Sequence, residues 1–177
     1  MLFRSAREEP ITLMTVQTNS PAPGGLADGT NSNQILDCSV AIFSSRETCD
    51  ELIATISHAV EALGRRRAVL DVVVNGNSAL ADTLANRMQT EVSLRAGIRL
   101  RAWFVAMGDK AAAWNQYVHA LAPSASIAVF IDGYARIDQG AISALQTAID
   151  AHPLALAATG IPRCGWSAPR LARQLRH

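Results

Sequence analysis

The sequence has few of the features that mark membrane, secreted or nucleic-acid-binding proteins. No apolar run approaches the roughly 18 residues that cross a bilayer, and residues 1–10 lack the apolar segment of a secretory signal. Three widely spaced cysteines (Cys38, Cys49 and Cys164) form neither a CxxC pair nor a Cys/His set, which argues against a disulfide framework and a zinc site. A net charge of +1 gives no reason to expect nucleic acid as a partner. The simplest expectation is a cytoplasmic protein.

Composition and length favour one folded domain flanked by two different ends. The chain has 177 residues, of which 49% are hydrophobic and 18% charged, as in globular proteins with a real core. Turn-forming residues are dense in 17–33, so residues 1–36 are expected to form a flexible arm, with a short strand within Ile11–Val16. Residues 37–165 are the expected domain. Residues 166–177 form a basic tail, which is interpreted as a solvated end, a partner helix or a contact with an anionic membrane surface.

Strand and helix patterns alternate along the expected domain. Buried or half-buried strands are predicted over Ser39–Phe43, Ala68–Val74, Ile98–Phe104, Ile127–Ile131 and Leu154–Thr159, the third of them as a half-exposed or edge strand. Because strands and helices alternate, the chain is predicted to be an α/β protein. Its sheet should be mostly parallel, with helices on both faces.

The helix patterns carry their own start and stop signals. Thr48 and Glu51 have the spacing of a capping box, and Gly64 is a plausible stop for the helix behind it. Further helices are expected around Leu80–Met88 and Trp114–Leu121, the latter with Trp114, Tyr117, Val118 and Leu121 on one side. A last helix should follow Asp138 as its cap, with Ile142, Leu145, Ala148 and Ile149 as its buried face.

Polar residues follow several of the predicted strands. Asp132 comes directly after the apolar run Ile127–Ile131, and Asn75 directly after Ala68–Val74. In open α/β sheets ligands bind at the carboxyl ends of the strands, where a lone Asp can hold a divalent cation that in turn holds a diphosphate. The alternative is that Asp132 and Asn75 only form turns, which Asp, Asn and Gly favour.

Four motifs, in order and at strand ends, resemble family 2 glycosyltransferases with the GT-A fold. They are the polar turn Ser44–Arg46, the turn Val74–Ser78 in place of Asp-Asp-Gly-Ser, the segment Gly108–Asn115 in place of Gly-Lys-x-x-Ala-Leu-Asn, and Asp132–Tyr134 in place of Asp-x-Asp. The helix Asp138–Ile149 and the run Leu154–Pro162 match the family's next elements. The resemblance covers about residues 38–165 and implies a GT-A or Rossmann-like domain that binds a nucleotide-diphospho-sugar, most readily a UDP-sugar.

The resemblance also implies roles for particular residues. Asn75 would contact the base, and Ser44 and Ser45 the nucleotide, although both serines are also suited to cap the next helix. Lys110 would approach the phosphates or remain solvated. Asn115 would pair across the pocket or lie on an exposed helix face. Asp132 would hold Mg²⁺ or Mn²⁺, which offsets negative charge on the leaving diphosphate. Trp114 and Tyr117 are interpreted as core residues rather than ligand platforms.

Two departures from the family pattern leave the activity open. Tyr134 replaces the second carboxylate of Asp-x-Asp, and no Asp or Glu occurs from Ala151 to His177, where the family places its general base. The chain is therefore interpreted as a shortened glycosyltransferase or as a non-catalytic nucleotide-binding or assembly module, with a homodimer possible in either case. No G-x-G-x-x-G follows the first strand, which disfavours an unrelated dinucleotide-binding domain. The glycosyltransferase interpretation requires Ser44, Asn75 and Asp132 to line one cleft.

Overall fold

The computed structural model describes residues 12–14 and 35–161, which divide into two units after Ile142. The strand expected within Ile11–Val16 is confirmed as β1 (Thr12–Met14). The remainder of the expected N-terminal arm and the whole basic tail, 166–177, lie outside the described residues.

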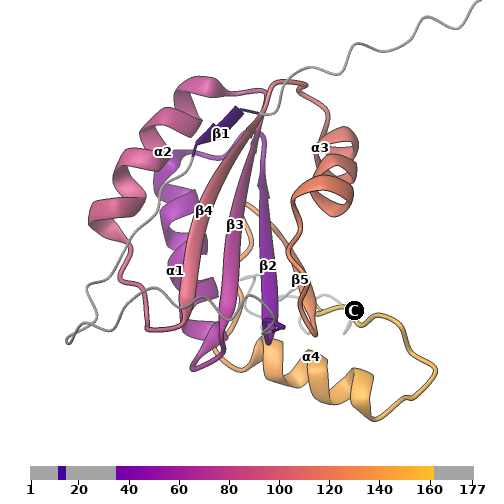
Figure 1. Ribbon diagram of the computed structural model, residues 1–177. Helices are drawn as coiled ribbons and strands as arrows, with labels where there is room; N and C mark the ends of the chain where they lie inside the picture. Colours follow the sequence, from indigo (N-terminus) through magenta and orange to yellow (C-terminus); the bar gives the residue numbers. More distant parts are fainter. Residues whose placement is uncertain (1–11, 15–34, 162–177) are drawn as a thin grey trace, which may run out of the picture. The chain divides into compact units, whose positions relative to one another are not determined.

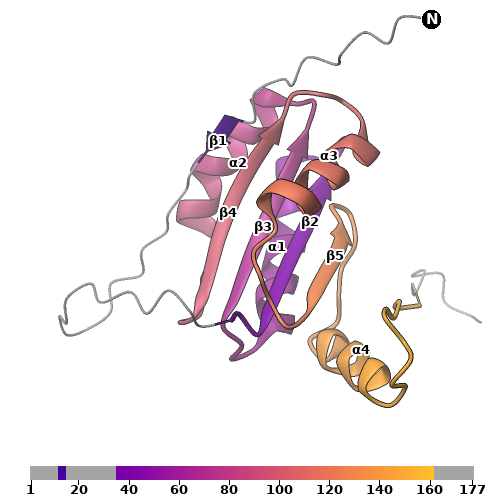
Figure 2. The same cartoon turned by 45° about the vertical axis from the view of Figure 1, so that its right-hand side comes forward.

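A five-stranded sheet forms the centre of the first unit, in the order β1-β4-β3-β2-β5 (Figures 1 and 2). Its strands after β1 are β2 (Cys38–Ser44), β3 (Ala68–Asn75), β4 (Ile98–Val105) and β5 (Ala128–Asp132). These four run parallel, whereas β1 pairs antiparallel with the outer side of β4. The predicted α/β class with a mostly parallel sheet is confirmed.

One face of the sheet is covered by α1 (Cys49–Leu63) and α2 (Ser78–Glu91), as Figure 1 shows. The predicted capping box of α1 is present, because the Glu51 amide donates to the Thr48 hydroxyl at 3.3 Å and the Thr48 amide donates to the Glu51 carboxylate at 2.8 Å. Gly64 ends α1 with φ 63°, a conformation that favours glycine. The buried faces of both helices pack on alternate residues of the strands, such as Ile42, Leu70 and Leu100. This is the main apolar core.

The opposite face of the sheet is covered by α3 (Lys110–Gln116) and the π-helix η1 (Tyr117–Leu121) that continues it. The Asp109 side chain caps α3 by accepting from the Ala111 amide at 2.8 Å. A smaller apolar cluster lies beneath, formed by Ala41, Phe43, Val73, Trp103, Val105, Ala113 and Tyr117. The predicted placement of helices on both faces is thus confirmed, but the second face has far less apolar cover than the first.

Two strand predictions need correction on this second face. The run ending at Ile131 was expected to be buried, whereas Ala128 and Phe130 of β5 are exposed, because β5 lies at an edge of the sheet. The strand Ile98–Phe104 was expected to be half exposed or an edge strand, but it is mostly buried: only Arg99 is exposed, and Trp103 is buried. It is not an edge strand either, since β1 pairs with its outer side. Within the helix predicted over Trp114–Leu121, Tyr117 is buried as expected, whereas Trp114 is 42% exposed.

The segment around Ile142 and beyond departs furthest from the sequence prediction. Helix α4 spans Ala141–Asp150, so Asp138 lies too early to be its cap, and Ala148 is exposed rather than buried. The run Leu154–Thr159 forms no strand, and Leu154 and Leu156 are almost fully exposed. Alternating Leu and Ala lack the β-branched and aromatic side chains that favour strands, and Ala is itself depleted there. Within the described residues, no helix combines the length and apolar character that a bilayer crossing needs.

Candidate functional site

The predicted site residues are distributed over two faces of the sheet at its carboxyl edge. Side chains alternate between faces along a strand, so Asn75 shares the α3 face with Val73. Asp132 is aligned with Phe43, which also lies on that face. Ser44 follows Phe43 and therefore points to the face of α1 and α2. Ser44 therefore does not line one cleft with Asn75 and Asp132, so the arrangement that the glycosyltransferase interpretation requires is not met. Asn75 and Asp132 share a face and an edge of the sheet.

Asn75 is a buried polar residue whose side chain has no hydrogen-bond partner within the part of the chain that the structure describes. Its side chain lies at the last position of β3, only 5% exposed. Neither the amide nitrogen nor the amide oxygen has a hydrogen-bond partner among the described residues. Leaving such a group unpaired costs about 1–3 kcal/mol. The carboxyl edge is where open α/β sheets commonly bind ligands. An amide there, with an NH2 donor and a carbonyl acceptor, is suited to a ligand that presents one acceptor and one donor.

Asp132 meets Lys110 across the gap between β5 and α3. The Lys110 ammonium donates to Oδ1 of Asp132, and the Tyr134 hydroxyl donates to Oδ2 at 3.2 Å. The side chains of Lys110 and Asp132 are 57% and 39% exposed, respectively, so the pair is accessible to a solute. Both carboxylate oxygens are thus engaged by side chains of the protein, and one of them by a positive charge.

The turn that carries Asp132 is held firmly against β2 and α1. The Gly133 amide donates to the Phe43 carbonyl at 2.8 Å, and the Thr55 hydroxyl donates to the Gly133 carbonyl at 2.6 Å. The Arg136 guanidinium donates in turn to the Thr55 hydroxyl. A Cβ at Gly133 would lie 3.1 Å from the Phe43 oxygen, so a larger residue would crowd this contact. The position of Asp132 is therefore fixed from both neighbouring elements.

Ser44 and Ser45 are involved in a local contact with Glu47. One oxygen of Glu47 accepts from the Ser44 hydroxyl at 3.0 Å and from the Ser45 and Arg46 amides at 2.8 and 3.1 Å. Burial acts to raise the pKa of Glu47, but these hydrogen bonds outweigh it and hold the pKa below its usual value. The alternative that the serines cap the helix is wrong, because Thr48 is the N-cap of α1. Their predicted nucleotide contact stays a prediction.

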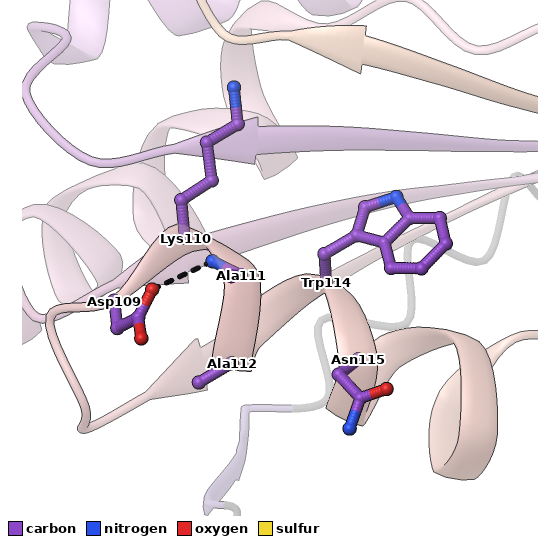
Figure 3. A pocket seen from close by; sticks show the side chains of 6 residues that line it. All are labelled: Asp109, Lys110, Ala111, Ala112, Trp114 and Asn115. Atoms are coloured by element: carbon purple, nitrogen blue, oxygen red, sulfur yellow. Dashed lines mark hydrogen bonds between the residues drawn. The ribbon is translucent and has the colours of Figure 1, made fainter.

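A surface hollow lies along α3 (Figure 3). It is lined by Asp109, Lys110, Ala111, Ala112, Trp114 and Asn115. Figure 3 shows Lys110 and Asn115 pointing to opposite sides of the helix. Asn115 therefore does not join the Lys110–Asp132 pair, and neither Asn75 nor Asp132 is among the residues that line this hollow. The candidate site is better defined by the sheet edge than by this hollow.

The residues around Asp132 do not fit a divalent cation held by the protein. Mg²⁺ and Mn²⁺ prefer several oxygen ligands, carboxylates above all. No group of three His, Cys, Asp or Glu side chains that suits a metal ion occurs within 12–14 and 35–161. The neighbours of Asp132 are an ammonium and a phenol. The positive charge beside Asp132 is that of the Lys110 ammonium.

The sequence analysis did not identify a buried carboxylate on the α3 face that accepts hydrogen bonds from three side chains. Asp71, in the middle of β3, is completely buried and bonded to Arg101, Trp103 and Tyr117. The signal was present, since Asp71 interrupts an otherwise apolar strand and Arg101 breaks the next one. The sequence analysis also did not identify the hydrogen bonds of Glu47, because no periodicity or motif in the sequence indicates what a carboxylate in a loop contacts.

Comparisons with protein-family models, with curated proteins and with solved structures found no match to this chain. The resemblance to family 2 glycosyltransferases thus rests on the quoted motifs alone. The UDP-sugar ligand, the Mg²⁺ or Mn²⁺ ion, the homodimer and the cytoplasmic location stay predictions.

Proposed function

We propose that this chain binds a nucleotide-diphospho-sugar at the carboxyl edge of the parallel sheet, on the face covered by α3. The observation that carries the proposal is the buried amide of Asn75, which has no partner among the residues described by the structure and lies on the same face and edge as the Lys110–Asp132 pair. Asn75 would contact the base, and Lys110 would contact the diphosphate.

The distance between Asn75 and the Lys110–Asp132 pair supports a nucleotide as the ligand rather than a smaller anion. Asn75 ends β3 and Asp132 ends β5, and β2 lies between these strands. Neighbouring strands are about 4.8 Å apart, so the two side chains start about 10 Å apart across the sheet. A nucleoside diphosphate spans such a distance between the edge of its base and its second phosphate. A free phosphate would leave the Asn75 amide unpaired.

Lys110 provides the charge at the phosphate end. Its ammonium is already directed toward Asp132, and more than half of its side chain is exposed. Lysine binds phosphate as a point charge, and the Asp132 carboxylate orients it. We therefore expect the diphosphate to bind when chelator is present. Stronger binding in Mn²⁺ that Asp132→Ala abolishes would instead support the metal expected from the resemblance.

Two activities follow from such a ligand. Transfer of the sugar to a hydroxyl acceptor is what the motifs imply. Binding without catalysis is favoured by Tyr134, which stands where the family has a second carboxylate, and by the full engagement of both Asp132 oxygens. We propose binding as the function of the described residues and treat glycosyl transfer as a second candidate, to be tested with sugar acceptors once a donor is known.

Calorimetric titration of UDP and UDP-sugars tests the proposal, in EDTA and in Mn²⁺. We expect saturable binding by the wild type in both, and a loss of at least about tenfold in affinity for Lys110→Met, about 1.4 kcal/mol or more. Arg99→Met is the matched control. Arg99 is an exposed cation on β4, near the opposite end of the sheet, and its loss should leave the affinity unchanged.

Absence of binding for UDP, GDP and their sugars in both buffers would overturn the proposal. Equal losses in Lys110→Met and Arg99→Met would show only a general effect of charge and would also count against the site. Binding that Lys110→Met abolishes while Arg99→Met retains it is the supporting result.

A further inference from the structure

Asp71 forms a buried polar cluster away from the candidate site. It lies in the middle of β3, four residues before Asn75 on the same face, and its side chain is completely buried. Arg101 donates to both of its oxygens, at 2.6 and 2.8 Å, from the directly opposite position on β4. Trp103 and Tyr117 each add a hydrogen bond of 2.8 Å. Each carboxylate oxygen therefore has two donors.

Apolar side chains of similar volume could fill the same space in the core as the Asp71 cluster. A buried ion pair is often no more stabilising than apolar side chains of similar volume, since desolvation offsets the attraction. Its distinctive property is directional, because each of its hydrogen bonds fixes a donor at one angle and distance. Burial, together with the negative charge of Asp71, raises the pKa of Tyr117, so its hydroxyl stays protonated and remains a donor.

Two contacts of the cluster reach the π-helix, one at each end. Tyr117 is the first residue of η1, and Leu121, whose carbonyl accepts from Arg101 at 3.4 Å, is the last. The Ala122 amide closes the same turn on the Tyr117 carbonyl at 2.8 Å. The wide turn is therefore bound to β3 and β4 at its beginning and at its end.

Helix α3 has little apolar packing of its own to hold it in place. Among its seven residues only Ala113 is buried, and a single methyl group gives little burial energy. Two side-chain contacts join it to the edge strand β5, those of Lys110 with Asp132 and of Trp114 with Phe130, whose ring centroids are 5.5 Å apart. Because η1 continues α3 without a break, whatever fixes η1 also sets the position of α3.

We propose that the Asp71 cluster is a positioning device, which anchors η1 to the sheet and thereby holds α3, and Lys110 on it, opposite Asp132. Tyr117 is the link between the carboxylate and the helix. The effect on ligand affinity rests on the proposed function, whereas the anchoring of α3 does not.

Tyr117→Phe tests the link with little other change. Phenylalanine keeps the ring that packs edge-on against Phe43 and Phe130, and removes only the hydroxyl. We expect hydrogen exchange at the amides of residues 113–116 to accelerate at least about tenfold more than at those of α1 and α2. Ile56→Val is the control, since Ile56 is buried in α1 on the opposite face and this change costs about 0.5–1.5 kcal/mol. In the control, α3 should not be selectively affected.

A double-variant cycle tests the connection to Lys110. UDP affinity should be at least about threefold lower in Tyr117→Phe than in the wild type. The double variant, which combines Tyr117→Phe with Lys110→Met, should bind UDP as strongly as Lys110→Met alone. Additive losses, or an unchanged affinity in Tyr117→Phe, overturn the role toward Lys110. If the wild type binds none of the nucleotides, the proposed function has failed, and hydrogen exchange alone decides the anchoring. Exchange that accelerates equally in α1, α2 and α3 overturns it.

Discussion

The two faces of the sheet differ in what their side chains do. The face under α1 and α2 is apolar, and its helices bury seven and five residues. The face under α3 contains Asp71, Asn75 and Asp132, while α3 itself buries one residue. The first face gains stability from burial, which depends on area and not on direction. The second combines a smaller apolar cluster with polar contacts, which fix direction at some cost in stability. The proposed function therefore assigns ligand binding to the side of the sheet opposite the main apolar core.

The largest effect should come from matched leucine truncations on the two faces. Leu84 of α2 is fully buried, whereas Leu121 of η1 is only partly buried. Leu84→Ala should lower the free energy of unfolding by about 2–5 kcal/mol, and Leu121→Ala by about 1 kcal/mol. Urea denaturation measures both. Equal losses would remove the distinction between the faces.

A pair of glycines tests the loops beside Asn75. Gly76 has φ 71°, and a Cβ there would lie 2.8 Å from the Gly108 Cα, whereas a Cβ on Gly108 would meet nothing within 4 Å. Gly76→Ala should lower the free energy of unfolding by about 1–3 kcal/mol and weaken UDP binding, because the contact must open. Gly108→Ala should be close to neutral in thermal and chemical denaturation. If the two variants behave alike, the close contact of the loops is wrong.

Removing the unpartnered amide should stabilise the protein and impair its function. Asn75→Leu replaces a buried polar group by an apolar one of similar size, so we expect the free energy of unfolding to rise by about 1–2 kcal/mol. UDP affinity should fall at least about tenfold in the same variant. Higher stability together with lower affinity is expected where a binding site retains a group that destabilises the fold. A destabilised variant with unchanged affinity would show that Asn75 is structural.

The smallest expected effect concerns the Glu47 loop. The pKa of Glu47 is lower in the folded than in the unfolded chain. The ionised Glu47 carboxylate therefore stabilises the fold at pH values above the unfolded pKa, about 4.3. This stabilisation is lost as the pH falls through the pKa of Glu47 in the folded chain. Glu47→Gln should therefore be less stable than the wild type at pH 7. The difference should shrink as the pH falls below about 4. A difference that is the same at pH 7 and pH 3 would contradict the hydrogen bonding described for Glu47.

Local signals in the sequence predicted much of the fold. The capping box of Thr48 and Glu51 and the stop at Gly64 depend only on neighbouring residues, and both are confirmed. The parallel sheet followed from the alternation of elements. The exposure of Phe130 did not, because an edge position depends on which strands are neighbours. The run Leu154–Thr159 was misjudged for a related reason, since a strand needs a partner and apolar content does not supply one.

The sequence predicted where the candidate site lies in the fold but not which side chains contact one another there. Asn75 and Asp132 were found because carboxyl ends of parallel strands share an edge. The face on which Ser44 lies required the register of β2, and the pairing of Lys110 with Asp132 required the position of α3. Asp71 shows the limit most clearly, since its donors come from 30 to 46 positions away in the sequence.

The most direct test of nucleotide binding on the α3 face observes the Asn75 side chain itself. In nitrogen-labelled protein, the side-chain amide signals of Asn75 can be followed by NMR while UDP is added. We predict that they shift on saturation, whereas those of Asn86, exposed on α2 on the opposite face, do not. Saturable binding that leaves the Asn75 signals in place would contradict the account, because the ligand would then bind elsewhere.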